Sequence, residues 1–195
     1  NYLATFAAVP FGRPLGWWRG PLPTFVAFAN QGFMDEVAHA AGTDPVEFRL
    51  RLLGEARELK YKGHGGPIFD TGRLATVLQR AANNIGYGRA LPAGHGIGVA
   101  AHFVFGAYSA HAMEVSVDEG KLNIHRCVCV VDVGTPVNPL GLDAQLSGGT
   151  IDGISTVLNL EITVKDGKIQ QSNFPDYRLL PMADAPDVEV DVVQT

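Results

Sequence analysis

The sequence predicts an α+β fold, in which a helical front half packs on a mostly antiparallel sheet that has one helix inserted between its strands. Residues 1–92 carry apolar side chains at helical spacing, whereas residues 93–195 hold segments rich in β-branched and aromatic residues, several of which alternate. The inserted helix is expected at about 138–159. We expect the two parts to belong to one domain, because 195 residues suffice for one large domain with a substantial core.

Charge and hydropathy argue against a nucleic-acid partner and against a membrane-spanning segment. The chain has 15 basic and 20 acidic residues, a net charge of -5, and its charges are spread along the sequence. A nucleic-acid partner is therefore not expected, because phosphate recognition calls for a basic patch. No apolar run approaches the roughly 20 residues of a membrane span, and the N-terminus lacks the features of a signal peptide.

Three helices are expected in the front half. The first begins at Thr24 and is closed by Gly42, and it carries a wide apolar face. The second has Thr43 or Asp44 as its N-cap and Pro45 at its first position. The third stops at Gly86. The expected helices span 24–41, 45–54 and 72–86.

Strand patterns follow in the back half. Turns at 118–121 and at Asp166-Gly167 join neighbouring strands into two hairpins. Cys127 and Cys129 alternate with valines, so they share one strand face, where their spacing does not favour a disulfide. We expect packed core thiols and no zinc site. The expected strands span 94–106, 110–117, 121–133, 160–165 and 168–174.

The stretch VVDVGTPVNPLGLDAQLSGGTIDG, residues 130–153, is the first candidate site. Asn138 caps the inserted helix, and Pro139 suits its first position. Each glycine inside a helix costs about 1 kcal/mol relative to alanine, which implies a close neighbour, either another backbone or a flat ligand. From spacing alone, tight packing of the helix on the sheet is the favoured interpretation. One face of this helix is expected to present Gln145, Gly148, Gly149 and Asp152.

The proline-rich segment 1–23 holds the second candidate. Its prolines predict an ordered loop that ends just before the first helix. Arg19-Gly20 precedes that helix, and a guanidinium near a helix N-terminus is suited to bind an anion or an amide. A surface salt bridge is the favoured interpretation of Arg19 from spacing alone. Trp17 and Trp18 suggest burial against another surface or an interface patch.

Several other patterns do not indicate a catalytic site. Gly94-x-Gly96 precedes a strand, whereas a dinucleotide fingerprint follows one and opens a helix. His102 and His111 could share a ligand only if the chain between them folded back, and no acidic partner lies at a fixed spacing. The sequence offers no evident nucleophile and base, and no catalytic residue or metal ligand is assigned.

Five segments together resemble the large, molybdenum-binding subunit of the xanthine dehydrogenase and aldehyde oxidase family. The likeness is closest to its branch of isoquinoline 1-oxidoreductase beta subunits. The helix phrase and the strand-turn-helix phrase around 132–153 are specific in combination. The matching segments are WWRGP at 17–21, FMDEVAHAAGTDPVEFRLRLL at 33–53, GHGIGVA with FGAYSAHAMEVSV up to 117, VVDVGTPVNPLGLDAQLSGGTIDGIS, and EITVKDGKIQQSNFPDYRLLPMADAPDVEV.

The resemblance implies part of a molybdenum hydroxylase, which inserts an oxygen atom from water into an aldehyde or an N-heterocycle. It implies a molybdenum-pterin cofactor, expected as molybdopterin cytosine dinucleotide, and an iron-sulfur partner subunit that takes the electrons. Gln145 matches the family glutamine that contacts the pterin, with Gly148 and Gly149 on the same helix face. Arg19-Gly20 matches a segment close to the molybdenum, and residues 106–109 are a weaker candidate for the same cavity.

The sequence also departs from the family pattern. The catalytic glutamate of the family lies in a G-x-G-E phrase, which we expect downstream of Thr195, and Glu114 and Glu161 match no such motif. We therefore expect a fragment that alone neither holds the cofactor nor turns over substrate. The alternative is a non-catalytic module that keeps this fold for subunit contact. The branch includes exported members, so cytoplasm and periplasm both stay open as compartments.

Overall fold

The computed structural model describes residues 19–60 and 66–193, together with residues 3, 5, 7, 8, 10, 12, 16 and 18. Of the predicted tryptophan patch, Trp17 therefore lies outside the described residues, while Trp18 is 44% exposed. Within the described part, no helix combines the length and the hydropathy that crossing a bilayer requires.

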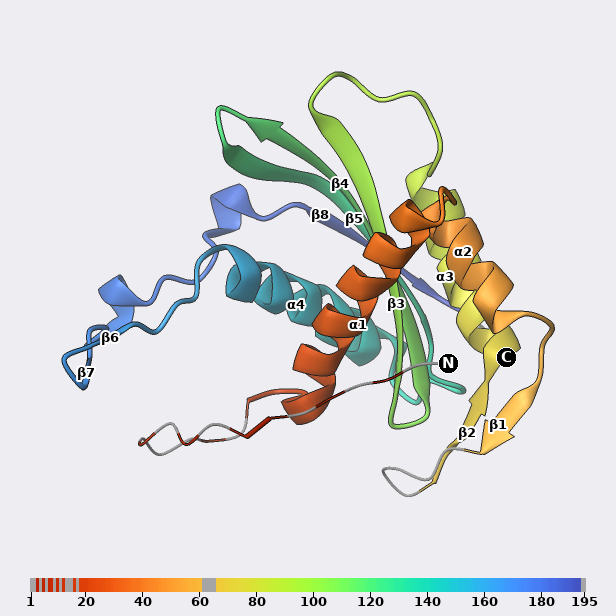
Figure 1. Ribbon diagram of the computed structural model, residues 1–195, viewed down its shortest axis with the longest axis horizontal. Coiled ribbons are helices and arrows are strands. Elements are labelled where there is room, and N and C mark those ends of the chain that lie inside the picture. Colours follow the sequence, from red (N-terminus) through yellow and green to blue (C-terminus); the bar gives the residue numbers. More distant parts are fainter. Residues whose placement is uncertain are drawn as a thin grey trace.

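The main sheet has the strand order β3-β4-β5-β8 among the described residues (Figure 1). Two hairpins make its antiparallel part, and they join β3 (His95–Val104), β4 (Ala107–Asp118) and β5 (Lys121–Asp132). The fourth strand, β8 (Asp187–Val192), pairs with β5 in parallel. The predicted α+β class, with a mostly antiparallel sheet, is confirmed.

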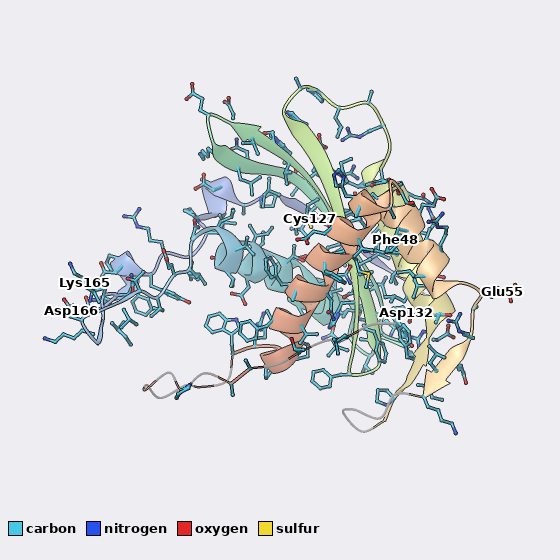
Figure 2. The ribbon with its side chains drawn as sticks, viewed as in Figure 1. Phe48, Glu55, Cys127, Asp132, Lys165 and Asp166 are labelled. Atoms are coloured by element: carbon cyan, nitrogen blue, oxygen red, sulfur yellow. The ribbon has the colours of Figure 1, made fainter. Side chains whose placement is uncertain are left out.

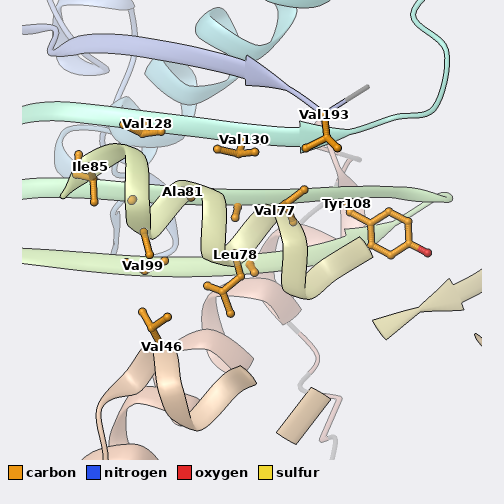
Figure 3. Close-up of a cluster of buried hydrophobic side chains, with 14 residues drawn as sticks. Val46, Val77, Leu78, Ala81, Ile85, Val99, Tyr108, Val128, Val130 and Val193 are labelled. Atoms are coloured by element: carbon orange, nitrogen blue, oxygen red, sulfur yellow. The ribbon is translucent and has the colours of Figure 1, made fainter. Parts of the chain in front are cut away.

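One face of this sheet is covered by α3 (Thr71–Ile85), whose apolar stripe lies against all three antiparallel strands. Figure 3 shows the resulting core, which α2 (Pro45–Leu53) joins through Val46. Burial of such side chains contributes about 1.5–3 kcal/mol each, so this layer is the main source of stability. The members of the core that are no more than 1% exposed are Val77, Leu78, Ala81, Ile85, Tyr108, Ala110, Ala112, Val128 and Val130.

The opposite face of the sheet carries α4 (Pro139–Leu158), the predicted inserted helix. Successive strand residues point to opposite faces, so His111 and the two cysteines lie on the α4 side while Ala110, Val128 and Val130 lie on the α3 side. Cys127 and Cys129 are free and fully buried, as predicted. Burial raises the pKa of Cys127 to about 12 and that of Cys129 to about 11.

The first helix, α1 (Pro21–Ala40), begins three residues earlier than predicted. The expectation of a loop through residue 23 was wrong, because Pro21 and Pro23 fall in the first turn. There the missing N–H groups have no partner inside the helix, so proline is tolerated.

The N-caps of the next two helices are carboxylates. Asp44 caps α2, accepting hydrogen bonds from the backbone of Val46 and Glu47, both at 2.9 Å. Asp70 caps α3 in the same way, and Gly86 ends α3 with a φ of 75°. Of the two N-cap candidates for α2, Thr43 and Asp44, the structure therefore shows Asp44 as the cap.

A buried arginine joins α1, α2 and the outer strand of the sheet. Arg49 is only 6% exposed, and its guanidinium donates to Gln31 Oε1 at 3.0 Å and to Asp35 Oδ1 at 2.7 Å. Gln31 Oε1 also accepts the backbone N–H of Ala101 on β3. Gln31 and Asp35, one helical turn apart on α1, are therefore polar because they hold this buried guanidinium.

Short elements complete the described chain. β1 (Glu58–Lys60) and β2 (Ile68–Asp70) form an antiparallel pair that the sequence did not predict. The second predicted hairpin is present but shorter than expected, with β6 (Val164–Lys165) and β7 (Lys168–Ile169). Figure 2 shows its tip, Lys165 and Asp166, projecting away from the sheet. Two 3-10 turns follow, η1 (Phe174–Asp176) and η2 (Met182–Asp184).

Candidate functional site

The entry into α4 is built by a strand end, a turn and a cap. Asn138 accepts the backbone N–H of Gly141 at 2.9 Å, and Pro139 occupies the first helical position, as predicted. The helix then packs towards the sheet through Thr150, Ile154 and Ser155, its buried residues. These three buried residues hold α4 against the sheet.

The other face of α4 is open. Gln145 and Gly148 are exposed, and Gly149 and Asp152 are half-buried. A Cβ atom added at Gly148 or Gly153 would have no heavy atom within 4 Å, apart from the adjacent residues and the backbone of α4 itself. Tight packing of these glycines on the sheet, the interpretation favoured by spacing alone, is therefore wrong. Their missing side chains leave a smooth surface that faces outward.

Arg19 reaches this open face from the start of α1. A Cβ at Gly149 would lie 3.9 Å from Arg19 Nη1, and that nitrogen lies 3.6 Å from Asp152 Oδ2. The two side chains are 65% and 36% exposed, so the ion pair contributes little to stability. The salt bridge predicted for Arg19 is present, and a ligand can displace it at low cost.

Gly20 sets the position of Arg19. It is the N-cap of α1 with a φ of 61°, a conformation that favours glycine. An added Cβ would come within 2.8 Å of Thr24 Oγ1, which donates a hydrogen bond to the carbonyl oxygen of Gly20 at 2.7 Å. Because Pro21 and Pro23 lack N–H groups, this helix N-terminus offers few backbone donors. Any binding capacity here rests on the guanidinium of Arg19.

These residues enclose one cavity of about 270 Å³. Four of the five predicted site residues line it, and the fifth, Gly20, is the residue next to Arg19. Its walls offer guanidinium and amide donors, amide and carboxylate acceptors, and a smooth glycine surface, the combination that a flat heterocycle with a polar edge requires. The lining consists of Arg19, Ala144, Gln145, Gly148, Gly149 and Asp152.

The turn that leads into α4 is held by an ion pair that sequence reasoning did not identify. Asp132, the last residue of β5, is 1% exposed and accepts two hydrogen bonds from the Arg73 guanidinium, with Nε to Oδ2 at 2.7 Å. Arg73 also lies over the ring of Tyr108, 4.4 Å from its centroid. The guanidinium keeps the pKa of Asp132 below its usual value, and Asp132 also accepts the backbone N–H of Gly134.

Of residues 106–109, the weaker candidate, Gly106 lies in the tip of the β3–β4 hairpin and the other three residues begin β4. Tyr108 pairs with Asp132 in the sheet register, so this segment lies at the same end of the sheet as the turn into α4. Tyr108 is buried, and its hydroxyl accepts the backbone N–H of Asp70 at 2.8 Å. None of these residues lines the cavity at α4.

The chain between His102 and His111 does fold back, because β3 and β4 form a hairpin. His102 lies opposite Ser109, and His111 lies opposite Ala100, so both imidazoles are on the α4 side of the sheet. Desolvation by burial lowers the pKa of both. Within the described residues, no group of three or more His, Cys, Asp or Glu side chains is placed to hold a metal ion.

Residues 77–186 match the molybdopterin cofactor-binding domain family. The chain belongs to this family. The match covers α4 with its glycine face, while Arg19 lies outside the matched range. The resemblance to the xanthine dehydrogenase and aldehyde oxidase family is thereby confirmed, together with a molybdenum-pterin as the class of cofactor that such domains bind.

The similarity to curated relatives extends beyond residues 77–186. The chain is 33% identical to the beta subunit of isoquinoline 1-oxidoreductase from Brevundimonas diminuta, covering 87% of this chain and 20% of that protein. It is 31% identical to a membrane-bound aldehyde dehydrogenase (pyrroloquinoline-quinone) of Gluconacetobacter polyoxogenes, covering 92% and 24%. For the B chain of nicotinate dehydrogenase from Pseudomonas putida, the identity is 28%, covering 89% and 15%. The chain thus spans only 15% to 24% of the length of these relatives.

One solved structure is similar to part of this chain. Quinoline 2-oxidoreductase from Pseudomonas putida 86 is 27% identical over 46% of this chain and 12% of its own, with a TM-score of 0.44.

The open face of α4 fits the cofactor class of the family. A pterin is flat and carries alternating donors and acceptors along its edge, and a glycine surface lets such a ring approach the helix backbone closely. Gln145 supplies both a donor and an acceptor, Arg19 supplies donors, and Asp152 supplies an acceptor.

Proposed function

We propose that this chain forms one wall of a molybdenum-pterin site in an enzyme that oxidises an aldehyde or an N-heterocycle with water as the oxygen source. The observation that carries the proposal is the meeting of Arg19 with Gln145 and the two glycines around one cavity. Arg19 is more than 120 residues from Gln145 in the sequence, and the family resemblance alone already singles out both. The named activities of the relatives support the same reaction class.

In this proposal each residue has a binding role. Gln145 hydrogen-bonds the pterin edge, Gly148 and Gly149 let the ring lie against α4, and Arg19 donates to an anionic or carbonyl group of the cofactor. Gly20 keeps Arg19 at that distance. The bound cofactor, proposed as the cytosine dinucleotide form, would supply the metal centre for oxygen transfer. Catalysis would also need a base that we do not assign to this chain, further segments of a large subunit, and an iron-sulfur partner.

The test compares cofactor content in two contexts. The 195-residue chain and a longer polypeptide that adds the segments present in the relatives are expressed in a host that makes the cofactor, and molybdenum and pterin are quantified. We expect the longer protein to retain both and the chain alone to retain neither. Stoichiometric binding by the chain alone would overturn the expectation of a fragment, and a longer protein that binds neither would overturn the proposed function.

Two matched substitutions locate the site. Gly149→Leu places a side chain against Arg19 in the cavity, whereas Gly153→Leu lies on the same helix outside it. We expect the first variant of the longer protein to lose most of its pterin and the second to keep it, with thermal unfolding as a check that both fold. Equal pterin content in the two variants would contradict the placement of the site.

A non-catalytic contact module is the second candidate. It is favoured by exposed aromatic residues on α1, where Phe25 is 67% exposed and Phe28 is 77% exposed, and by Trp18 beside them in sequence. In this case the longer protein would form the subunit complex but hold no molybdenum. The same measurement of metal content therefore distinguishes the two functions.

A further inference from the structure

A second cavity, of about 310 Å³, lies between α1 and the β3–β4 hairpin. It shares no lining residue with the cavity at α4. Part of its wall is apolar and comes from Ala27, Phe28 and Ala100. A cavity of this size is at the lower end of the range for small-molecule sites, and it has room for one or two fused rings.

The polar part of the wall contains two imidazoles. His102 Nε2 is buried and has no hydrogen-bond partner among the described residues, which is costly for a polar atom. His111 Nε2 lies 3.1 Å from Thr150 Oγ1. Because the Thr150 hydroxyl donates its proton to the carbonyl oxygen of Leu146, His111 must be the donor, which leaves its Nδ1 as an acceptor.

The residues that line the cavity include no lysine or arginine. Burial keeps both histidines neutral by lowering their pKa values. Asp35 also lines the cavity, and its carboxylate is paired with the Arg49 guanidinium at 2.7 Å. Ser109 adds a hydroxyl group. The wall therefore suits an uncharged ligand better than an anion, because an anion would lose its hydration without gaining a counter-ion and would lie near the Asp35 carboxylate.

We propose that this cavity is a binding site for a small, neutral heteroaromatic molecule with an N–H donor. The ring lies against Phe28 and the alanines, and its N–H group is directed to the imidazole acceptor of His111, beside His102 in the wall. The inference is independent of the proposed molybdenum-pterin site, because the two cavities use different residues and different ligand chemistry.

The test is a titration of the full chain followed by NMR, with indole as the probe. We expect the ring signals of His102 and His111 to shift with increasing indole. 1-Methylindole, which lacks the donor, is expected to bind about tenfold more weakly, as is usual for the loss of one hydrogen bond to a buried partner. Indole-3-carboxylate is expected to bind more weakly still. No shift with indole, or equal binding of all three compounds, would overturn the proposal.

Gly32 offers a matched pair of variants. It lines the cavity, and an added Cβ would have no neighbour within 4 Å. Gly32→Leu fills the space and is expected to weaken indole binding by at least tenfold, while Gly32→Ala stays within about twofold of the unaltered chain. Ala100→Leu fills the cavity from the strand side and replaces Gly32→Leu should that variant not fold. Unchanged affinity in the folded cavity-filling variant would place the indole elsewhere.

Discussion

Asp132 connects the core of the molecule to the candidate cofactor face. Its carboxylate is buried at the end of β5, where Arg73 neutralises it and Tyr108 covers the guanidinium. The same carboxylate accepts the N–H of Gly134, the residue that begins the turn into α4. Loss of this one charge would therefore disturb both the sheet and the start of the helix.

Asp132→Asn is expected to lower the free energy of unfolding by about 3 kcal/mol, because it leaves the Arg73 charge without a partner next to the core. The measurement is urea denaturation monitored by circular dichroism. Glu189→Gln is the matched control, since the Arg126–Glu189 pair is largely exposed and should contribute less than about 1 kcal/mol. Equal losses in the two variants would show that burial of the Asp132 pair adds nothing.

His102 and His111 predict a dependence of stability on pH. Burial lowers their pKa values in the folded chain, whereas a histidine in the unfolded chain has a pKa of about 6.5. As the pH falls below that value, the unfolded chain takes up protons that the folded chain does not, so the free energy of unfolding must decrease.

We expect a decline between about pH 7.5 and 5.5, measured by denaturation at several pH values. The double variant His102→Gln, His111→Gln should flatten it. His39→Gln, an exposed position on α1, should leave the slope unchanged. A slope that survives in the double variant would assign the pH dependence to other groups.

At the scale of elements, α4 has two faces with different tasks. Its buried residues hold the helix on the sheet, and Ser155 Oγ accepts the backbone N–H of Leu180 at 2.8 Å, which ties the following segment to the helix. Its glycines contribute nothing to that packing. The helix thus tolerates destabilising residues on one side because the other side anchors it.

Gly153→Ala should raise the free energy of unfolding by about 0.5–1 kcal/mol, because the position has helical geometry and open space for a methyl group. Gly86→Ala is the opposite control: its φ of 75° strains any side chain, so stability should fall. Thermal unfolding of both variants is the measurement. A destabilised Gly153→Ala chain would indicate that a neighbour packs against this face.

The sequence predicted the elements with strong local signals and missed those that depend on pairing. α3 and α4 were predictable because their caps and apolar spacing are local. β8 and the β1–β2 pair were not, since a strand of three to six residues becomes visible only through its hydrogen-bonded neighbour. The start of α1 was misplaced because proline disfavours a helix interior and favours its first turn.

At the scale of the molecule, the segment 160–186 projects from the sheet and exposes large apolar side chains. Phe174 is 86% exposed and Met182 is 94% exposed. Figure 1 shows the β6–β7 hairpin as the part of this segment that lies farthest from the sheet. Among the described residues this hairpin is a separate two-stranded sheet, so local opening there should cost far less than global unfolding.

Limited trypsin digestion should therefore cut first at Lys165 or Lys168. The two products are expected to stay together in size-exclusion chromatography, because β8 remains hydrogen-bonded to β5. Mass spectrometry identifies the cut. A first cut within β5, or separation of the products under native conditions, would contradict this description of the segment 160–186.

The candidate site was predictable in its residues and not in its geometry. Gln145 and its glycines share a helix face by simple periodicity, but nothing in the spacing of Arg19 indicates that it reaches Asp152. That contact depends on where α1 begins and on the left-handed backbone at Gly20. The Arg73–Asp132 pair was missed for a related reason, because a buried ion pair between distant residues leaves no local pattern.

The two edges of the sheet are completed at very different times during synthesis. The β3 edge meets Gln31, which has already left the ribosome when β3 is made, whereas β5 waits for β8 until residue 192 has been translated. In that interval a nascent chain presents an unpaired strand that carries Val128 and Val130. Unpaired strand edges recruit other chains. Products truncated before residue 187 should therefore aggregate more readily than the 195-residue chain, because β5 keeps its unpaired edge.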